Sequence, residues 1–291
     1  MIEGWPVLPL EEWRDTRDTL HRWMQVVGKI RLALTPLINH WWNVPLYVTP
    51  RGMTTSNIAI GDRWFDMEFD FIDHVLRIRT NDGAGRDVAL APRTVADFYN
   101  DVFAALRALH IDCSIWPVPV ECDNPIPLDR DDEHKSYDAE YVQRFWRATA
   151  LVDEVFTKFR ARFIGKCSPV HFFWGSFDLA VTRFSGRRAP ARENADAITR
   201  EAYSHEVSSV GFWPGDNRMP QTTFYSYASP EPDGYRSAVS AQYLEAFGGF
   251  YLPYDDVRLA ADPEITLLDF CERAYVAAAD LGKWDRKALE R

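Results

Sequence analysis

Two stretches decide the fold: TPLINHWWNVPLYVTPRG at 35–52 and SPVHFFWGSFDLAVTRFSG at 168–186. Each contains a proline, then a histidine with aromatic residues behind it, then an apolar segment that closes on Val-Thr. Such a pair is either two catalytic signatures or one fold unit that occurs twice. We interpret it as a repeated fold unit, because the predicted elements around the two stretches follow in the same order.

The first unit predicts a helix, a run of strands and a second helix. Apolar residues spaced three and four apart predict a helix over 16–34, which Pro36 ends. A second helix begins after Thr94, its predicted N-cap, and a strand at 112–120 follows it. Turn sequences separate the strand candidates between the helices, at 46–49, 56–60, 64–72, 74–80 and 87–91.

Strand 64–72 shows the clearest alternation of apolar and acidic side chains in the chain. Its phenylalanines and Met67 point to one side of the predicted strand, and Asp66, Glu68 and Asp70 point to the other. This pattern is typical of a half-buried antiparallel strand, so we expect the three acidic residues to form a solvated face rather than a cation site.

The second unit repeats this order. A segment rich in proline and charge, 125–137, reads as a linker, and a helix over 138–163 follows it. Strand candidates at 202–213, 222–228 and 248–254 lead to a last helix, with Asp262 as N-cap and Gly282 as its end.

These patterns predict an α+β protein of two tandem repeats, each a helix, antiparallel strands and a helix, packed as one compact unit. The boundaries are 1–124 for the first repeat, 125–137 for the linker and 138–291 for the second repeat with its longer loops. In this alignment Thr49 and Thr182 end equivalent strands, and Asp97-Phe98 matches Asp269-Phe270.

Composition excludes several classes of protein. The 291 residues are 46% hydrophobic and 14% aromatic, but no apolar run reaches the roughly 20 residues that span a bilayer, and we expect a soluble, cytoplasmic protein. The net charge of −10 disfavours nucleic-acid binding. The four cysteines form no C-x-x-C pair, which indicates reduced thiols rather than a disulfide framework or a zinc site.

Asp178 is the most conspicuous candidate for chemistry. It interrupts a stretch that is apolar on both parities, and a buried unpaired carboxylate is costly, so it requires a partner, a proton or a place at the sheet's end. The possible partners are Arg183, His171, His205 or a backbone turn. In an unbroken strand His171 and Arg183 share one face and Asp178 the other, so a His171–Asp178 pair needs a bulge, for which Gly175 is the natural place. The alternative is a structural polar cluster.

A second polar group lies at EAYSHEVSSVGFWPG, 201–215. Alternation places His205 and Ser209 on one face and Glu206 on the other. Neither H-E-x-x-H nor G-x-S-x-G occurs, so the sequence selects no metal site, no catalytic triad and no particular cofactor.

Arginines and aromatic rings suggest what a ligand would be. The loop RFSGRRAPAR, 183–192, offers guanidinium groups for an anion, although they equally serve to balance surface charge. Aromatic side chains suit either a dense core or an apolar pocket with tyrosine hydroxyls. They gather on strands expected to be neighbours: Trp41, Trp42, Phe172, Phe173, Trp174, Phe212, Trp213, Tyr225 and Tyr227.

The chain resembles a family of uncharacterised bacterial proteins that is defined as a domain of unknown function. The resemblance covers nearly the whole chain and is carried by long motifs, among them NHWWNVPLYVTPRGMTTS, SPVHFFWGSFDLAVTRFSGRRAP and EAYSHEVSSVGFWPG. It implies a bacterial, cytosolic protein of one architecture, and no activity, cofactor or catalytic residue.

We therefore expect binding, with or without enzymatic conversion, of a small partly aromatic or anionic molecule, in a pocket formed mainly by the second repeat. The alternative is a non-catalytic protein that uses an aromatic surface for interaction or self-assembly into a homo-oligomer. The predicted acid, base or orienting groups are His171, Asp178 and His205, and the predicted ligand contacts are Arg183, Arg187, Glu206, Tyr225 and Trp174.

Overall fold

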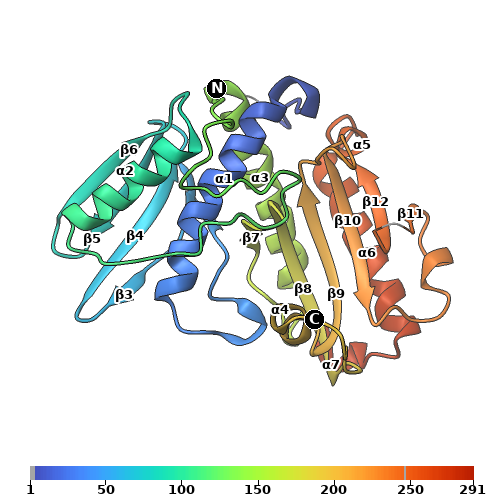
Figure 1. Ribbon diagram of the computed structural model, residues 1–291. Helices are drawn as coiled ribbons and strands as arrows, with labels where there is room; N and C mark the ends of the chain where they lie inside the picture. Colours follow the sequence, from blue (N-terminus) through green and yellow to red (C-terminus); the bar gives the residue numbers. More distant parts are fainter. Residues whose placement is uncertain (1–3, 246) are drawn as a thin grey trace.

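The computed structural model describes residues 4–245 and 247–291, which form an α+β protein with two antiparallel sheets of six strands each (Figure 1). The sheets lie side by side, with the long helices α1 and α3 between them. In the described residues no helix is both long and apolar enough to cross a membrane.

The first sheet has the strand order β1-β2-β4-β5-β6, and β3 pairs with the other end of β4. The elements are α1 (Leu10–Leu34), the 3-10 turn η1 (Asn39–Trp41), β1 (Tyr47–Val48), β2 (Gly52–Thr54), β3 (Ile58–Ile60), β4 (Arg63–Asp70), β5 (Val75–Thr80), β6 (Gly85–Ala89) and α2 (Val95–Ala108).

The second sheet has the strand order β7-β8-β9-β10-β12-β11. Its elements are α3 (Ala139–Ala161), β7 (His171–Phe173), β8 (Asp178–Arg188), α4 (Ala197–Ala202), β9 (His205–Trp213), β10 (Thr223–Ser229), η2 (Tyr235–Ser237), β11 (Gln242–Leu244), β12 (Gly249–Pro253), α5 (Tyr254–Arg258), α6 (Pro263–Leu281) and α7 (Arg286–Leu289).

The predicted helix starts are confirmed by their caps. The Thr94 hydroxyl accepts from the Asp97 backbone N–H at 3.0 Å, and the Asp262 carboxylate accepts from that of Ile265 at 3.0 Å. Such side-chain acceptors satisfy N–H groups that have no partner within the helix. The first helix starts earlier than expected, at Leu10.

Strand β4 confirms the predicted alternation but not the solvated acidic face. Phe65, Met67 and Phe69 are buried, and so are Glu68 and Asp70 on the other parity. Arginines make that burial possible: Arg51 lies 2.6 Å from Asp70, and Arg79 lies 2.8 Å from Glu68. The expectation failed because these ion pairs cover the acidic side of the strand.

The segment 109–138 forms neither the predicted strand at 112–120 nor regular structure elsewhere. Pro117 and Pro119 cannot donate to a strand ladder, and the segment instead crosses α1 (Figure 1). The Gln25 side chain of α1 holds it there, with its Oε1 accepting from the Val120 N–H and its Nε2 donating to the Val120 carbonyl, both at 2.8 Å. Further along, Asp131 is fully buried, 3.2 Å from the Arg22 guanidinium.

Residues 168–186 do not form one unbroken strand. Strands β7 and β8 are a tight hairpin around a turn at 174–177, in which Phe173 pairs with Asp178 and His171 with Ala180. The predicted faces were therefore wrong: His171 and Asp178 share one face of the sheet, and Arg183 lies on the other. The match of Thr49 with Thr182 was also wrong, because Thr49 follows the edge strand β1 whereas Thr182 lies inside β8.

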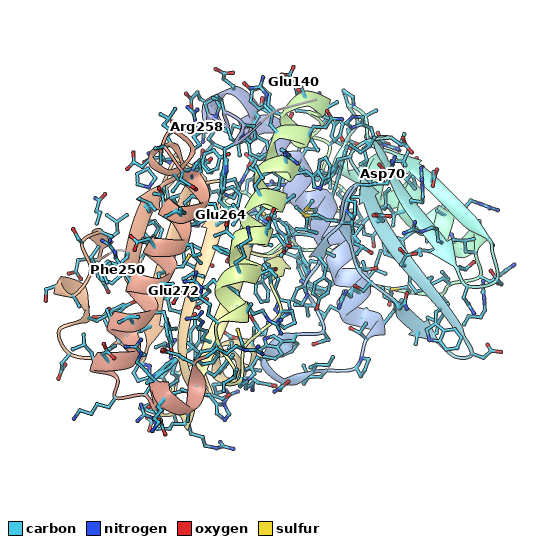
Figure 2. All side chains as sticks on the ribbon, turned by 180° about the vertical axis from the view of Figure 1, so that it is seen from behind. Asp70, Glu140, Phe250, Arg258, Glu264 and Glu272 are labelled. Atoms are coloured by element: carbon cyan, nitrogen blue, oxygen red, sulfur yellow. The ribbon has the colours of Figure 1, made fainter. Side chains whose placement is uncertain are left out.

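The two predicted signature stretches nevertheless meet. Leu46 and Phe172 exchange backbone hydrogen bonds of 2.9 and 3.0 Å, which join the edges of the two sheets. Helices α3 and α6 cover one face of the second sheet, as Figure 2 shows from behind. No long helix covers the opposite face in the described part of the chain, and that face carries the candidate site (Figure 1).

Candidate functional site

A cavity of about 440 Å³ lies on the face of the second sheet that points away from α3 and α6. Cross-strand partners share a face of a sheet, and the register pairs Ala180 with Gly211 and Gly211 with Tyr225. Side chains of this one parity line the cavity from four neighbouring strands: Phe173, Asp178, Ala180, Thr182, Val207, Ser209, Trp213, Tyr225 and Tyr227.

The remaining walls come from segments far apart in the sequence. Arg17 comes from α1, Glu121 from the segment that crosses it, and Arg218 from the loop after β9. His40, Trp42, Tyr203, Phe247 and Tyr251 complete the lining together with Phe184, Ala202, Ser176 and Asp216. Aromatic rings therefore surround a small number of polar and charged groups.

Asp178 is the most buried acid of this cavity, with 6% of its surface exposed. The hydroxyl groups of Ser176 and Tyr225 donate hydrogen bonds to its two carboxylate oxygens. Burial raises the pKa of Asp178 above that of a free aspartate, although the two hydroxyl donors act in the opposite direction. A carboxyl group that is buried in a cavity lining is a candidate for proton transfer to or from a bound molecule.

Gly211 makes the contact between Tyr225 and Asp178 possible. It lies on β9, between the strands that carry the two residues, and a Cβ at this position would be 2.1 Å from the Tyr225 ring. The tyrosine ring therefore lies flat over the backbone of β9 and reaches β8. Any side chain at position 211 would displace it.

Glu121 is a further carboxyl group at the cavity, and no sequence pattern pointed to it. Its backbone has a left-handed φ of 53°, which is unusual for a residue other than glycine. Glu121 is an exposed residue of the lining, crowded by neighbouring parts of the protein. Burial raises the pKa of Glu121, the charge of Asp178 raises it further, and Arg218 acts in the opposite direction.

Hydroxyl groups continue the polar lining beyond Asp178. The Tyr203 hydroxyl donates to that of Tyr227 at 3.1 Å, and the Tyr227 ring stacks on Tyr225 with centroids 6.2 Å apart. The hydroxyls of Thr182 and Ser209 are 2.9 Å apart. Burial raises the pKa of both Tyr225 and Tyr227 well above its ordinary value, so both phenols are neutral donors at physiological pH.

At another part of the lining, His40 is held as a neutral ring. Its Nδ1 lies 3.0 Å from the carbonyl oxygen of Glu201, and the Lys166 ammonium donates to its Nε2 at 2.6 Å. Burial lowers the pKa of His40, and the charge of Lys166 lowers it further. His205 does not line the cavity. Its ring centroid is 5.6 Å from that of His40, and burial together with Lys166 lowers its pKa.

His171 lies behind the cavity wall. It is fully buried, and its ring makes edge contacts with Trp42 at 5.8 Å, Tyr47 at 5.6 Å and Phe173 at 5.4 Å. Neither ring nitrogen has a hydrogen-bond partner among the described residues. Burial lowers the pKa of His171 to about 3, so the ring is neutral. The structure thus places His171 and Asp178 on one face without bringing them into contact.

The other predicted ligand contacts point elsewhere. Arg183 lies between α3 and α6, with its guanidinium 3.4 Å from the centre of the Phe159 ring and 3.3 Å from Glu272. Arg187 and Glu206 form an ion pair at 2.7 Å, and Arg187 also donates to the Gly282 carbonyl beyond α6. Trp174 packs on Gly28 of α1 and donates to the Val44 carbonyl at 2.8 Å. Tyr225 is the member of this set that lines the cavity.

Within the described residues, no group of three or more histidine, cysteine, aspartate or glutamate side chains is arranged to hold a metal ion. A family model covers residues 5–291 of this chain. The chain belongs to DUF5996, a family of unknown function. No curated protein and no solved structure matches it. Membership of DUF5996 brings no functional residue with it, so any account of function depends on the geometry of the cavity.

Proposed function

We propose that this DUF5996 protein binds a small, partly aromatic molecule in the cavity of the second sheet, and that Asp178 and Tyr225 form the polar centre that orients it. The volume of about 440 Å³ falls in the range of small-molecule sites. Aromatic walls with a few convergent polar groups are also typical of such sites.

The observation that carries this proposal is the carboxyl group of Asp178 at the base of the cavity. Folding removes it from water and supplies only two hydroxyl donors in return. Burying an acid with so few partners lowers stability, and such carboxyl groups cluster at functional sites.

Strained backbone at three residues also supports this cavity as the functional site. Glu121, His40 and Phe177, the residue before Asp178, all have φ values between 53° and 61°. Residues other than glycine adopt this conformation at a cost, and they concentrate at functional sites. Three of them at or beside one cavity indicate that its walls are built for a particular shape.

If the bound molecule is converted, Asp178 is the candidate acid or base, because its raised pKa suits proton transfer. Tyr225 would hold its orientation, and His171 would support the wall through Trp42 and Phe173. The aromatic residues around Asp178 face a cavity rather than a flat surface, which supports a ligand site over the alternative of an aromatic interaction surface.

A thermal-shift screen of metabolites tests this proposal on the wild type, Asp178→Asn and Tyr225→Phe, with Arg162→Gln on the far side of the sheet as control. A ligand of this cavity stabilises the wild type and the control and loses most of its effect in the two site variants. If every stabilising compound acts equally on all four proteins, the cavity is not the site.

We also propose that the two halves arose by internal duplication, in a different register from the Thr49–Thr182 match. In this register β1 corresponds to β7, and the two halves would meet at the Leu46–Phe172 bridge. The support is that each half runs from a long helix through a six-stranded antiparallel sheet, in which most strands pair with their neighbours in the chain, to a closing helix. Profiles of the two halves built from many family members should align with β1 on β7, and alignment in no register would contradict it.

A further inference from the structure

We propose that the ligand carries a positively charged amine, which sits between the carboxyl groups of Asp178 and Glu121 and the surrounding aromatic rings. This inference rests on the proposed function, since it names the chemical class of the ligand of the same cavity.

The first argument is the charge of the cavity. Hydroxyl groups are the side-chain partners of Asp178 in the described structure, and no lysine or arginine is among them. No hydrogen bond from a described side chain to Glu121 contributes to its environment. Among the described residues neither carboxyl group forms an ion pair, although the charge of Arg218 acts on the exposed Glu121, and a cationic ligand would supply the buried Asp178 with the partner it lacks.

The second argument is that the two arginines of the lining already have acidic partners. Arg218 lies 2.6 Å from Asp216. Arg17 lies 2.7 Å from Asp18, and its guanidinium stands over the Phe177 ring at 5.5 Å. Each of these arginines therefore already has an acidic partner, and neither is paired with Asp178.

The third argument is the aromatic wall. Trp213, Tyr225 and Tyr227 line the cavity on the strands next to Asp178, and Trp42 and Phe173 line it as well. The face of an aromatic ring attracts a cation, by about 0.5 to 2 kcal/mol per contact depending on desolvation. Aromatic rings and carboxylates together favour an ammonium group and disfavour a carboxylate or phosphate.

The two arginines that the sequence analysis assigned to an anionic ligand do not line the cavity. Arg183 is sealed between α3 and α6, and Arg187 is paired with Glu206 outside the cavity. The chain as a whole carries a net charge of −10, which also attracts cations. The anionic ligand expected from the sequence therefore lacks the side chains that were to bind it.

A charge-matched set of probes tests the inference: 2-phenylethylamine, its trimethylammonium analogue, 2-phenylethanol and 3-phenylpropionate. Their affinities are measured by calorimetry on the wild type, Asp178→Asn, Glu121→Gln and the control Asp132→Asn, whose exposed side chain lies outside the cavity. Tyr225→Phe is measured in the same way. We expect at least one amine to bind the wild type about tenfold more tightly than the alcohol. This ratio of affinities should fall to about one in Asp178→Asn, decrease in Glu121→Gln and persist in the control. Circular dichroism confirms that each variant is folded.

The outcomes separate the two proposals. If the alcohol or the carboxylate binds as tightly as the amines and Tyr225→Phe weakens its binding, the cavity is a ligand site but the ligand is not an amine. If the amines bind all variants equally, they bind elsewhere and the amine inference fails. If no probe binds, the amine inference fails, while the metabolite screen still decides the proposed function. A trimethylammonium probe that binds more tightly than the primary amine supports the role of the aromatic faces.

Discussion

Tyr225 donates its phenolic hydrogen bond to Asp178 across an entire strand, because Gly211 on the intervening strand leaves room for its ring. The contact joins β10 to β8 on the cavity side of the sheet and fixes the position of the buried carboxyl group. The geometry of the site therefore requires glycine at position 211.

Gly211→Ala should therefore destabilise the fold and displace the Tyr225 ring. The added Cβ would be 2.1 Å from the ring, and relief of such overpacking typically costs about 1 to 3 kcal/mol. Chemical denaturation measures the loss in the free energy of unfolding. In a Tyr225→Ala background the same substitution should cost much less, because the clashing ring is absent. Equal costs in both backgrounds would show that the ring is not what requires glycine.

His171 should contribute to acid sensitivity. Its pKa is about 3 in the folded protein against about 6.5 for a free histidine, so between these values the unfolded chain binds a proton that the folded chain does not. The free energy of unfolding therefore falls as the pH drops below about 6.5.

The variant His171→Phe should flatten this dependence. Melting temperatures measured between about pH 7 and about pH 4.5 should fall less steeply than in the wild type. The exposed Trp116, which does not titrate, provides the control substitution Trp116→Phe, which should leave the slope unchanged. An unchanged slope in His171→Phe would mean that the buried ring does not titrate in this way. His21, whose pKa burial also lowers to about 3, accounts for part of the slope that remains.

The sequence predicted correctly those structural features that depend on residues close together in the chain. The caps at Thr94 and Asp262 and the alternation of β4 depend on residues a few positions apart, and these predictions are confirmed. The hairpin at 174–177 escaped detection because Phe177 takes a left-handed conformation within an apolar stretch that reads as a continuous strand.

The site depended on long-range packing, which one sequence does not display. Asp178 could be singled out as a carboxyl group in an apolar stretch, and Tyr225 as a phenol on a neighbouring strand. Glu121 could not, because it reaches the cavity only through the path of 109–138 across α1. The anion contacts expected of Arg183 and Arg187 had a sequence rationale, but strand parity and an ion pair direct those side chains away.

Arg183 should prove important for folding and unimportant for ligand binding. Its guanidinium is 1% exposed and contacts the rings of Phe159 and Tyr275 as well as Glu272. Breaking a buried ion pair of this kind typically costs about 3 kcal/mol or more, so Arg183→Ala should lower the free energy of unfolding by that order. Arg162→Ala removes an exposed arginine 3.5 Å from the same Glu272 and should have a small effect. Comparable losses in both variants would contradict the role given to the buried site.

Asp153 on α3 should reduce stability at neutral pH. Burial raises its pKa to about 6, and no described side chain pairs with it. Between about pH 4 and pH 6 the folded state holds a proton that the unfolded state has lost, so this residue's contribution to stability declines as the pH rises through 6. Asp153→Asn should raise the melting temperature at pH 7 by about 1 to 3 °C, and little or not at all near pH 4. The exposed Asp132→Asn serves as control, and an equal rise at both pH values would contradict the assignment.

The central claim is that the cavity around Asp178 is the functional site. A crystal structure of the protein with the strongest stabilising amine from the binding experiments tests it most directly. We predict density in the cavity, with the ammonium group beside Asp178 and Glu121 and the hydrocarbon part against the rings of Tyr225 and Trp213. A ligand bound outside this cavity, while the Asp178 carboxyl group remains in contact only with Ser176 and Tyr225, would contradict the account.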